Sequence, residues 1–225
     1  MAPTSEVPGA YAHLLSEALV LEVLGELPSA GSRVLDVGCG RGGACALLAR
    51  ETGAARIVGL DRCAEGVETC RKNVSDERIE FVEGDAQALP FPDESFEQVL
   101  NLESAHGYPD RRAFFGEVYR VLVPGGRFCY ADGVPPDTLE EQAKDLAAAG
   151  LVVDEVEDIT KPVIEALQRS SDDRRAFFDA MIEAKTVDTE FAGRLCTALT
   201  TSIPEIYQKG TLHYVRWSCH KPDGA

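Results

Sequence analysis

The chain has no apolar stretch of the roughly 18 residues that a membrane-spanning helix requires. Residues 1–6 have neither the basic region nor the apolar core of a secretory signal peptide. The 7 cysteines are scattered, and no two of them form a C-x-x-C pair or a zinc-binding pattern. Such cysteines are typical of small buried residues in a reducing compartment, so we expect a cytoplasmic protein without a membrane span.

Clusters of basic residues are also lacking. The chain contains 22 Lys and Arg residues against 38 Asp and Glu residues, and its formal net charge is −16. Binding to nucleic acid or to an anionic membrane depends on grouped Lys and Arg, so we expect neither as a partner. The simplest consequence of the acidity is solubility. The length of 225 residues, with 44% hydrophobic and 27% charged residues, is ordinary for one globular domain.

Strand patterns alternate with helix patterns along most of the chain, which indicates a mostly parallel sheet covered by helices on both faces. The expected strands are residues 33–37, 56–60, 79–83, 98–102, 127–131, 151–156 and 211–219. The expected helices are residues 10–27, 42–53, 63–74, 111–122 and 138–149, and Pro124-Gly125-Gly126 is expected to turn the chain into the fifth strand. We therefore predict a Rossmann-like α/β fold. We expect residues 1–225 to form a single domain with a core at 10–159 and 210–220. Residues 160–209 are expected to form a helical cap over the edge of the sheet, as the roof of the site for a second substrate.

The end of the first strand carries a glycine pattern that is typical of a nucleotide-binding loop. Asp36 is followed by Gly38, Cys39, Gly40 and Gly42, and alternating glycines remove the Cβ atoms where a ligand would press against the backbone. The spacing differs from the dinucleotide fingerprint G-x-G-x-x-G, and a carboxylate here repels a pyrophosphate but attracts a cation. The loop resembles that of class I S-adenosylmethionine-dependent methyltransferases. The resemblance implies S-adenosylmethionine as cofactor and S-adenosylhomocysteine as product.

Further candidates for the cofactor site follow the next three strands, because the ends of parallel strands meet at one edge of the sheet. Asp61, followed by Arg62, is placed to accept hydrogen bonds from both ribose hydroxyls, although NAD-binding folds use a carboxylate in the same way. The resemblance implies that Asp85 binds the adenine amino group with Ala86 beside it. Asn101 completes the set at the fourth strand. Three carboxylates at one rim would suit a sulfonium cation with an amino group better than a pyrophosphate.

The loop after the fourth strand offers a proton acceptor. Histidine is the side chain that most readily accepts a proton near neutral pH, and His106 lies in this loop. Asp132, at the end of the neighbouring fifth strand, is expected to orient His106 and to stabilise its protonated form. Glu103 is a rival for the orienting role, or a ligand of the methionine amino group. Methyl transfer otherwise needs mainly the alignment of the reacting groups.

Longer phrases of the sequence resemble a subgroup of these methyltransferases that acts on natural products. They are LPFPDESFEQV, ESAHGYPD, VYRVLVPGG, YAD and DITKPVIEALQ. The subgroup includes O-methyltransferase domains of polyketide synthases, sugar O-methyltransferases and phthiotriolone-type lipid methyltransferases. In its sugar enzymes, a histidine after strand four and an aspartate after strand five form the base pair, which implies these roles for His106 and Asp132. We expect O-methylation of a small-molecule polyketide, glycoside or lipid in secondary metabolism.

Several alternatives remain open at this point. The chain could methylate nitrogen or carbon, bind S-adenosylmethionine or a nucleotide without catalysis, or be an NAD-dependent oxidoreductase. No cluster of metal ligands stands out in the sequence, so no metal is expected. Apolar residues at helical spacing within 160–209 could pack on the sheet or cover a second copy of the chain, which leaves a homodimer open.

Overall fold

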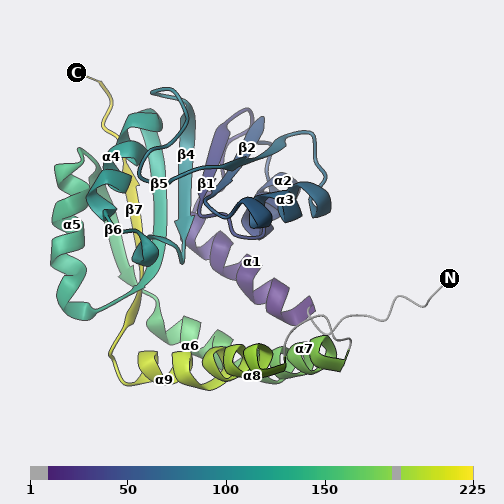
Figure 1. Cartoon of the computed structure of the whole chain (residues 1–225). Helices are drawn as coiled ribbons and strands as arrows, with labels where there is room; N and C mark the ends of the chain where they lie inside the picture. Colours follow the sequence, from purple (N-terminus) through teal and green to yellow (C-terminus); the bar gives the residue numbers. More distant parts are fainter. Residues whose placement is uncertain (1–9, 184–188, 225) are drawn as a thin grey trace.

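The computed structural model describes residues 10–183 and 189–224 and contains a seven-stranded sheet in the order β3-β2-β1-β4-β5-β7-β6 (Figure 1). The strands are β1 (Arg33–Val37), β2 (Arg56–Asp61), β3 (Ile79–Glu83), β4 (Phe96–Leu102), β5 (Leu122–Val134), β6 (Val152–Asp158) and β7 (His213–His220). Strands β1 to β5 pair in parallel, and β7 is antiparallel to both of its neighbours. This topology confirms the predicted Rossmann-like fold with a mostly parallel sheet.

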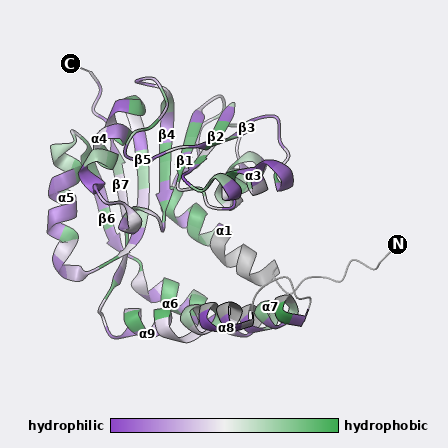
Figure 2. Ribbon diagram, viewed as in Figure 1, coloured by the Kyte–Doolittle hydropathy of each residue, from purple (hydrophilic) through white to green (hydrophobic). Residues whose placement is uncertain are grey.

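Helices cover both faces of the sheet. They are α1 (Ala10–Leu24), α2 (Gly43–Glu51), α3 (Ala64–Asn73), α4 (Arg111–Val121), α5 (Leu139–Ala148), α6 (Thr160–Arg169), α7 (Ser171–Glu183), α8 (Thr189–Thr197) and α9 (Ile203–Gln208), with short helical turns η1 (Ala105–Gly107), η2 (Pro136–Thr138) and η3 (Ala198–Ser202). Buried residues of α4 and α5 pack on one face of the sheet, and buried residues of α1, α2 and α3 pack on the other. Figure 2 shows the resulting concentration of hydrophobic residues on the central strands.

The central strands are apolar on both faces because both faces are covered. In β1, Leu35 and Val37 belong to the buried cluster beneath α4, whereas Val34 belongs to the cluster beneath α1 and α2. At the antiparallel edge, Trp217 of β7 stacks on Tyr130 of β5 with ring centroids 4.7 Å apart. This stacking, together with the β5–β7 hydrogen bonds, fixes the last strand beside the parallel part of the sheet.

The largest difference from a predicted boundary is at the start of the fifth strand. Pro124-Gly125-Gly126 was expected to separate a helix from the fifth strand, but β5 already begins at Leu122 and runs through this segment. Its pairing with β4 shifts register between Phe96, opposite Leu122, and Gln98, opposite Arg127. Gly125 has φ 72° and its N–H donates to the carbonyl of Lys221 at 2.9 Å. The Pro-Gly-Gly segment is therefore a bulge held by hydrogen bonds, because glycine tolerates the left-handed conformation that the bulge requires.

Helices α6 to α9 follow β6 in the chain and precede β7. Figure 1 shows them as a layer across the end of the sheet toward which β4 points. Since loops that follow parallel strands lie at this end, the layer is on the side of the sheet where the cofactor site is expected. Within the described residues, no helix is both long enough and apolar enough to cross a membrane.

Candidate active site

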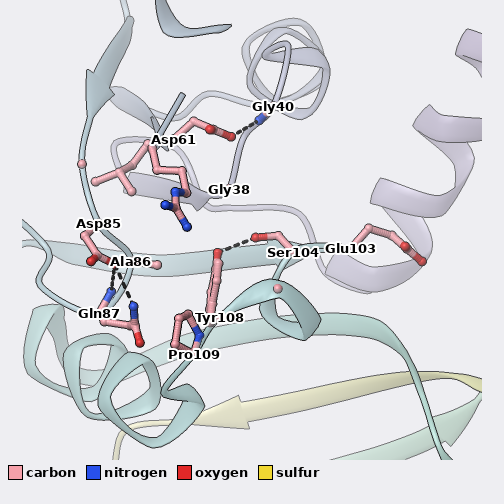
Figure 3. Close-up of a pocket in the computed structure, with 14 residues that line it drawn as sticks. Gly38, Gly40, Asp61, Asp85, Ala86, Gln87, Glu103, Ser104, Tyr108 and Pro109 are labelled. Atoms are coloured by element: carbon pink, nitrogen blue, oxygen red, sulfur yellow. Dashed lines mark hydrogen bonds between the residues drawn. The ribbon is translucent and has the colours of Figure 1, made fainter. Parts of the chain in front are cut away.

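A pocket of about 790 Å³, part of it open solvent, lies at the carboxyl ends of β1 to β4 (Figure 3). It is lined by Gly38, Gly40, Leu60, Asp61, Arg62, Gly84, Asp85, Ala86, Gln87, Glu103, Ser104, Gly107, Tyr108 and Pro109. The lining includes six predicted cofactor positions: Gly38, Gly40, Asp61, Arg62, Asp85 and Ala86. The structure therefore brings residues from three separate loops to one cavity, as the arrangement of parallel strands requires.

The glycine loop is held against the end of β2. The N–H groups of Gly38 and Cys39 both donate to the carbonyl of Leu60, at 2.7 and 3.0 Å. Gly38 has φ 76°, and a Cβ there would overlap the side chain of Ser104. A Cβ on Gly40 would meet nothing within 4 Å, so this position leaves open space above the backbone. The loop thus combines a fixed backbone with room for a ligand, which is what close binding of a nucleotide needs.

Asp61 connects the glycine loop to the start of α3. Its carboxylate accepts hydrogen bonds from the N–H groups of Gly40 and Cys63, each at 2.9 Å, and the side chain also lines the pocket. Asp85 is exposed, and accepts from the backbone N–H of Gln87 at 2.9 Å and from its side-chain amide at 3.2 Å. These hydrogen bonds lower the pKa of Asp85. Both carboxylates are therefore oriented in advance by backbone donors.

Four predicted cofactor positions do not line the pocket. They are Asp36, Cys39, Gly42 and Asn101. Gly42 faces the ring of Phe81, 2.7 Å from where its Cβ would be, and so allows α2 to pack closely on β3. Asn101 is fully buried and donates from its amide to the carbonyl of Val37 at 2.8 Å and to the hydroxyl of Tyr108 at 3.1 Å. Gly42 and Asn101 therefore support the loops through packing and hydrogen bonds and do not face the pocket.

Asp36 also lies beneath the loop, so the expected rim of three carboxylates contains only Asp61 and Asp85. The Asp36 side chain is 3% exposed and accepts a hydrogen bond from the Cys45 thiol at 3.5 Å. Burial raises the pKa of its carboxyl from 3.8 to about 7. The reason for the difference from the expectation is local: the side chain at this strand position points between the sheet and α2 instead of outward.

Replacing Asp36 with asparagine should stabilise the free protein by about 2–4 kcal/mol at pH 8, since each pKa unit corresponds to about 1.4 kcal/mol. Below about pH 4 the folded and unfolded states are both protonated. Between pH 4 and 7 the folded state retains a proton that the unfolded state releases, so this group lowers stability as the pH rises. Denaturant unfolding from pH 4.5 to 8 should therefore show a gap between variant and wild type that widens with pH, and parallel curves would contradict the prediction.

His106 and Asp132 form a closely bonded pair next to the pocket. His106 lies in η1, and its Nδ1 is 2.7 Å from one carboxylate oxygen of Asp132. The backbone N–H of His106 donates to the other oxygen at 2.8 Å, and the N–H of Gly133 donates to the first at 2.8 Å. The Asp132 side chain is 0% exposed, whereas that of His106 is 56% exposed. An ionised carboxylate only accepts hydrogen bonds, so we assign the proton to Nδ1, which leaves the Nε2 lone pair available.

Glu103 is the third member of this group. It has φ 51°, which is rare for a residue other than glycine, and its N–H donates to the carbonyl of Ala131 at 3.0 Å. One carboxylate oxygen of Glu103, one ring nitrogen of His106 and one carboxylate oxygen of Asp132 lie within 4.8 Å of one another. Partial desolvation raises the pKa of Glu103, and desolvation also raises that of Asp132 despite the opposing effect of His106.

These three side chains could also hold a metal ion, which the sequence analysis did not anticipate. The ligand spacing was invisible along the chain because Asp132 lies 26 positions after His106, and pairing of β4 with β5 brings them together. Both oxygens of Asp132 accept hydrogen bonds, two at one oxygen and one at the other, so one lone pair of the second oxygen remains available. The same three side chains can therefore serve proton transfer or hold a metal ion.

Four further hydroxyl-bearing side chains lie around the site, and of these the sequence offered no role for Ser104 or Tyr214. Ser104 and Tyr108 line the pocket, their hydroxyls bond to each other, and burial raises the pKa of Tyr108 to about 12. Tyr207 of α9 and Tyr214 of β7 are buried, and Glu103 and Asp132 contribute to raising the pKa of both, after desolvation. No motif marks the two tyrosines, because they come from the end of the cap and the last strand.

Comparison with known proteins points in the same direction. A family model described as a methyltransferase domain matches residues 35–130. A fatty-acid O-methyltransferase from Mycolicibacterium smegmatis is 42% identical over 154 residues, which cover 68% of this chain and 56% of that protein. A phthiotriol/phenolphthiotriol dimycocerosates methyltransferase from Mycobacterium tuberculosis is 38% identical over 194 residues, which cover 86% of this chain and 70% of that protein.

The fold agrees with these relatives. The crystal structure of phosphoethanolamine N-methyltransferase 2 from Haemonchus contortus, in complex with S-adenosyl-L-methionine, superposes with a TM-score of 0.79 at 20% sequence identity. The match covers 92% of this chain and 52% of that one. The family match includes the glycine loop, Asp61, Asp85 and the His106 loop. The chain therefore belongs to the class I S-adenosylmethionine-dependent methyltransferases.

Proposed function

We propose that the protein transfers the methyl group to a hydroxyl of a small-molecule natural product of the polyketide, glycoside or lipid type, with His106 as general base. The observation that carries this proposal is the His106–Asp132 pair, in which a fully buried carboxylate holds Nδ1 of a histidine whose side chain is 56% exposed. The two relatives support a lipid-type acceptor, since one is named for fatty acids and the other for phthiotriol dimycocerosates.

The pocket residues fit S-adenosylmethionine. Asp61 and Asp85 provide carboxylates for ribose hydroxyls and for the adenine amino group, and Gly40 leaves open space above the backbone. The negative charge of the rim suits a ligand that carries a sulfonium and an ammonium group. When bound, S-adenosylmethionine supplies a methyl group that is already activated by its positive sulfur.

A hydroxyl acceptor needs a proton acceptor in addition to the activated methyl group, and His106 and Asp132 provide it. A neutral hydroxyl must lose its proton as its oxygen bonds to the methyl carbon, and Nε2 of His106 is free to accept that proton. The Asp132 carboxylate, oriented by two backbone N–H groups, stabilises the resulting imidazolium. Because the His106 side chain is exposed, the proton can then pass to solvent. We place helices α6 to α9 over the acceptor side of this pair.

A methyl-labelling experiment tests the reaction type. The purified protein is incubated with S-adenosylmethionine carrying a trideuterated methyl group and with long-chain acceptors of one chain length that end in an alcohol, a carboxylic acid or an amine. Mass spectrometry should find the label on the alcohol oxygen, with the same rate after treatment with EDTA. Labelling of the amine or the acid alone would refute the proposal, and loss of the label with EDTA would indicate metal-assisted transfer.

A further inference from the structure

We propose that Glu103 binds a second hydroxyl of the acceptor, adjacent to the one that is methylated, so that the enzyme selects diols over isolated alcohols and over carboxylic acids. This inference rests on the proposed function of His106 and names the class of acceptor that the same site takes. It concerns a neutral acceptor segment with two neighbouring hydroxyl groups.

Glu103 lines the pocket, but its carboxyl points away from the residues assigned to adenosine. Its left-handed conformation, with φ 51°, costs energy and is held by the hydrogen bond from its N–H to the carbonyl of Ala131 in β5. Strain of this kind is found where a side chain must point in one direction for function. Figure 3 shows the carboxyl of Glu103 pointing away from Asp61 and Asp85, which face the cofactor pocket. The carboxyl is therefore directed away from the groups assigned to adenosine.

Glu103 lies close enough to the His106 ring for one small acceptor segment to contact both. A carboxylate oxygen of Glu103 is within 4.8 Å of one ring nitrogen of His106, and Nε2 belongs to the same ring. Hydroxyls on neighbouring carbons are closer together than this, and each can donate one hydrogen bond of about 2.7 Å to its own acceptor. One hydroxyl then donates to His106 and the other to Glu103. An acceptor with a single hydroxyl would leave the Glu103 carboxylate without that bond.

Two buried tyrosines lie beside Glu103. Tyr214 is 2% exposed, and an interaction of its hydroxyl with the Glu103 carboxylate lowers the pKa of Glu103, against the larger effect of desolvation. Its ring lies 5.9 Å from that of Tyr207, measured between centroids. Desolvation and the nearby Glu103 raise the pKa values of both tyrosines further above their ordinary range. Glu103 itself is exposed, so its carboxylate is accessible to an acceptor, and a hydrogen bond to this charged group is stronger than one between neutral groups.

The charges around the base argue against a carboxylic acid as acceptor. Glu103 and Asp132 each have a carboxylate oxygen within 4.8 Å of a ring nitrogen of His106. A third carboxylate would be repelled by both at this distance. It would also gain nothing from a general base, since it is already ionised at neutral pH. A neutral diol meets two hydrogen-bond acceptors without this repulsion.

Matched acceptors test the inference. Three long-chain compounds of equal length are compared: a vicinal diol, the corresponding secondary alcohol and the corresponding carboxylic acid. For the wild-type protein, kcat/KM for the diol should exceed that for the alcohol by at least about tenfold, the value of one hydrogen bond to a charged group. In Glu103→Gln the ratio should fall toward one through an increase in KM for the diol, and Glu103→Asp should lie in between.

Binding measurements separate this role from a cofactor role. Calorimetric titration of the diol into the complex with S-adenosylhomocysteine should show weaker binding in Glu103→Gln, whereas the Kd for S-adenosylhomocysteine itself should change by less than about twofold. Glu68→Gln is the matched control, because Glu68 is exposed on α3 and pairs with Lys72 away from the site. It should keep the wild-type diol preference.

Each contrary outcome has a defined meaning. If wild type methylates diol and alcohol equally, the inference is wrong while the proposed function stands. If it methylates no hydroxyl at all, the proposed function fails and the inference fails with it. If Glu103→Gln weakens S-adenosylhomocysteine more than tenfold and keeps the diol preference, Glu103 binds the amino group of the cofactor. A preference for an amino alcohol over the diol would show that Glu103 selects a cation, which would also overturn the inference.

Discussion

Replacing His106 with alanine should lower kcat for a hydroxyl acceptor by about 10²–10⁴-fold, the usual contribution of a general base. In the proposed mechanism, Nε2 of His106 accepts the hydroxyl proton while Asp132 holds the ring through Nδ1. Binding of S-adenosylhomocysteine should change little, because His106 does not line the cofactor pocket. Steady-state kinetics together with calorimetry measure the two effects separately.

The chain contains a matched control for this variant. On the protein surface, Nδ1 of His220 pairs with the carboxylate of Asp154 at 2.9 Å, in the same kind of contact. His220→Ala should therefore keep wild-type activity. Asp132→Asn should reduce kcat as well, since the amide no longer favours the tautomer with the proton on Nδ1. If His106→Ala stays within about threefold of wild type, the reaction does not need this base, and transfer to nitrogen becomes the better explanation.

The fold could be predicted because local patterns and long-range topology agree. Buried strands such as β1 read as short apolar runs, and β3 begins and ends at the predicted residues. Parallel strands with right-handed crossovers then determine which loops share an edge. The Pro124–Gly126 segment escaped prediction because a bulge and a turn require the same residues, and only the pairing of β5 with β4 and β7 distinguishes them.

The site was predictable to the level of loops but not of side-chain directions. The strand-end rule depends only on topology, and the structure places Asp61 and Asp85 at the pocket and His106 next to Asp132. Whether a strand-end side chain points into the pocket or below it depends on the local register of the turn. Asp36 points below and contacts Cys45 on α2, which no pattern in one sequence reveals.

Contributions from distant segments were harder still. Tyr207 and Tyr214 approach Glu103 from the end of the cap and from the last strand, and both look like ordinary core residues in the sequence. Their position depends on how α9 leads into β7 and how β7 inserts beside β5. The apolar pattern of a single sequence predicts that such residues are buried. It does not predict which charged group they will lie beside.

Asp61→Ala should weaken binding of S-adenosylhomocysteine by about 10- to 100-fold, corresponding to the loss of hydrogen bonds to a charged acceptor. Asp61 lines the pocket, and its carboxylate also accepts from the N–H groups of Gly40 and Cys63. The variant therefore loses the proposed ribose ligand and one restraint on the glycine loop at once. Asp85→Ala is the natural comparison, since Asp85 is exposed and its carboxylate accepts hydrogen bonds only from Gln87 among the described residues. It should have the smaller effect.

A second ligand separates the two contributions of Asp61. An analogue of S-adenosylhomocysteine without the two ribose hydroxyls should bind wild type weakly. Removing the hydroxyls removes the same hydrogen bonds that are lost when the Asp61 carboxylate is removed. If Asp61 binds the ribose, the analogue should lose little further affinity in Asp61→Ala, so that the two changes are strongly non-additive. If Asp61 only holds the loop through Gly40, the losses should add. Calorimetry with both ligands on both proteins completes the cycle, and additive losses would remove the ribose assignment while leaving the loop restraint intact.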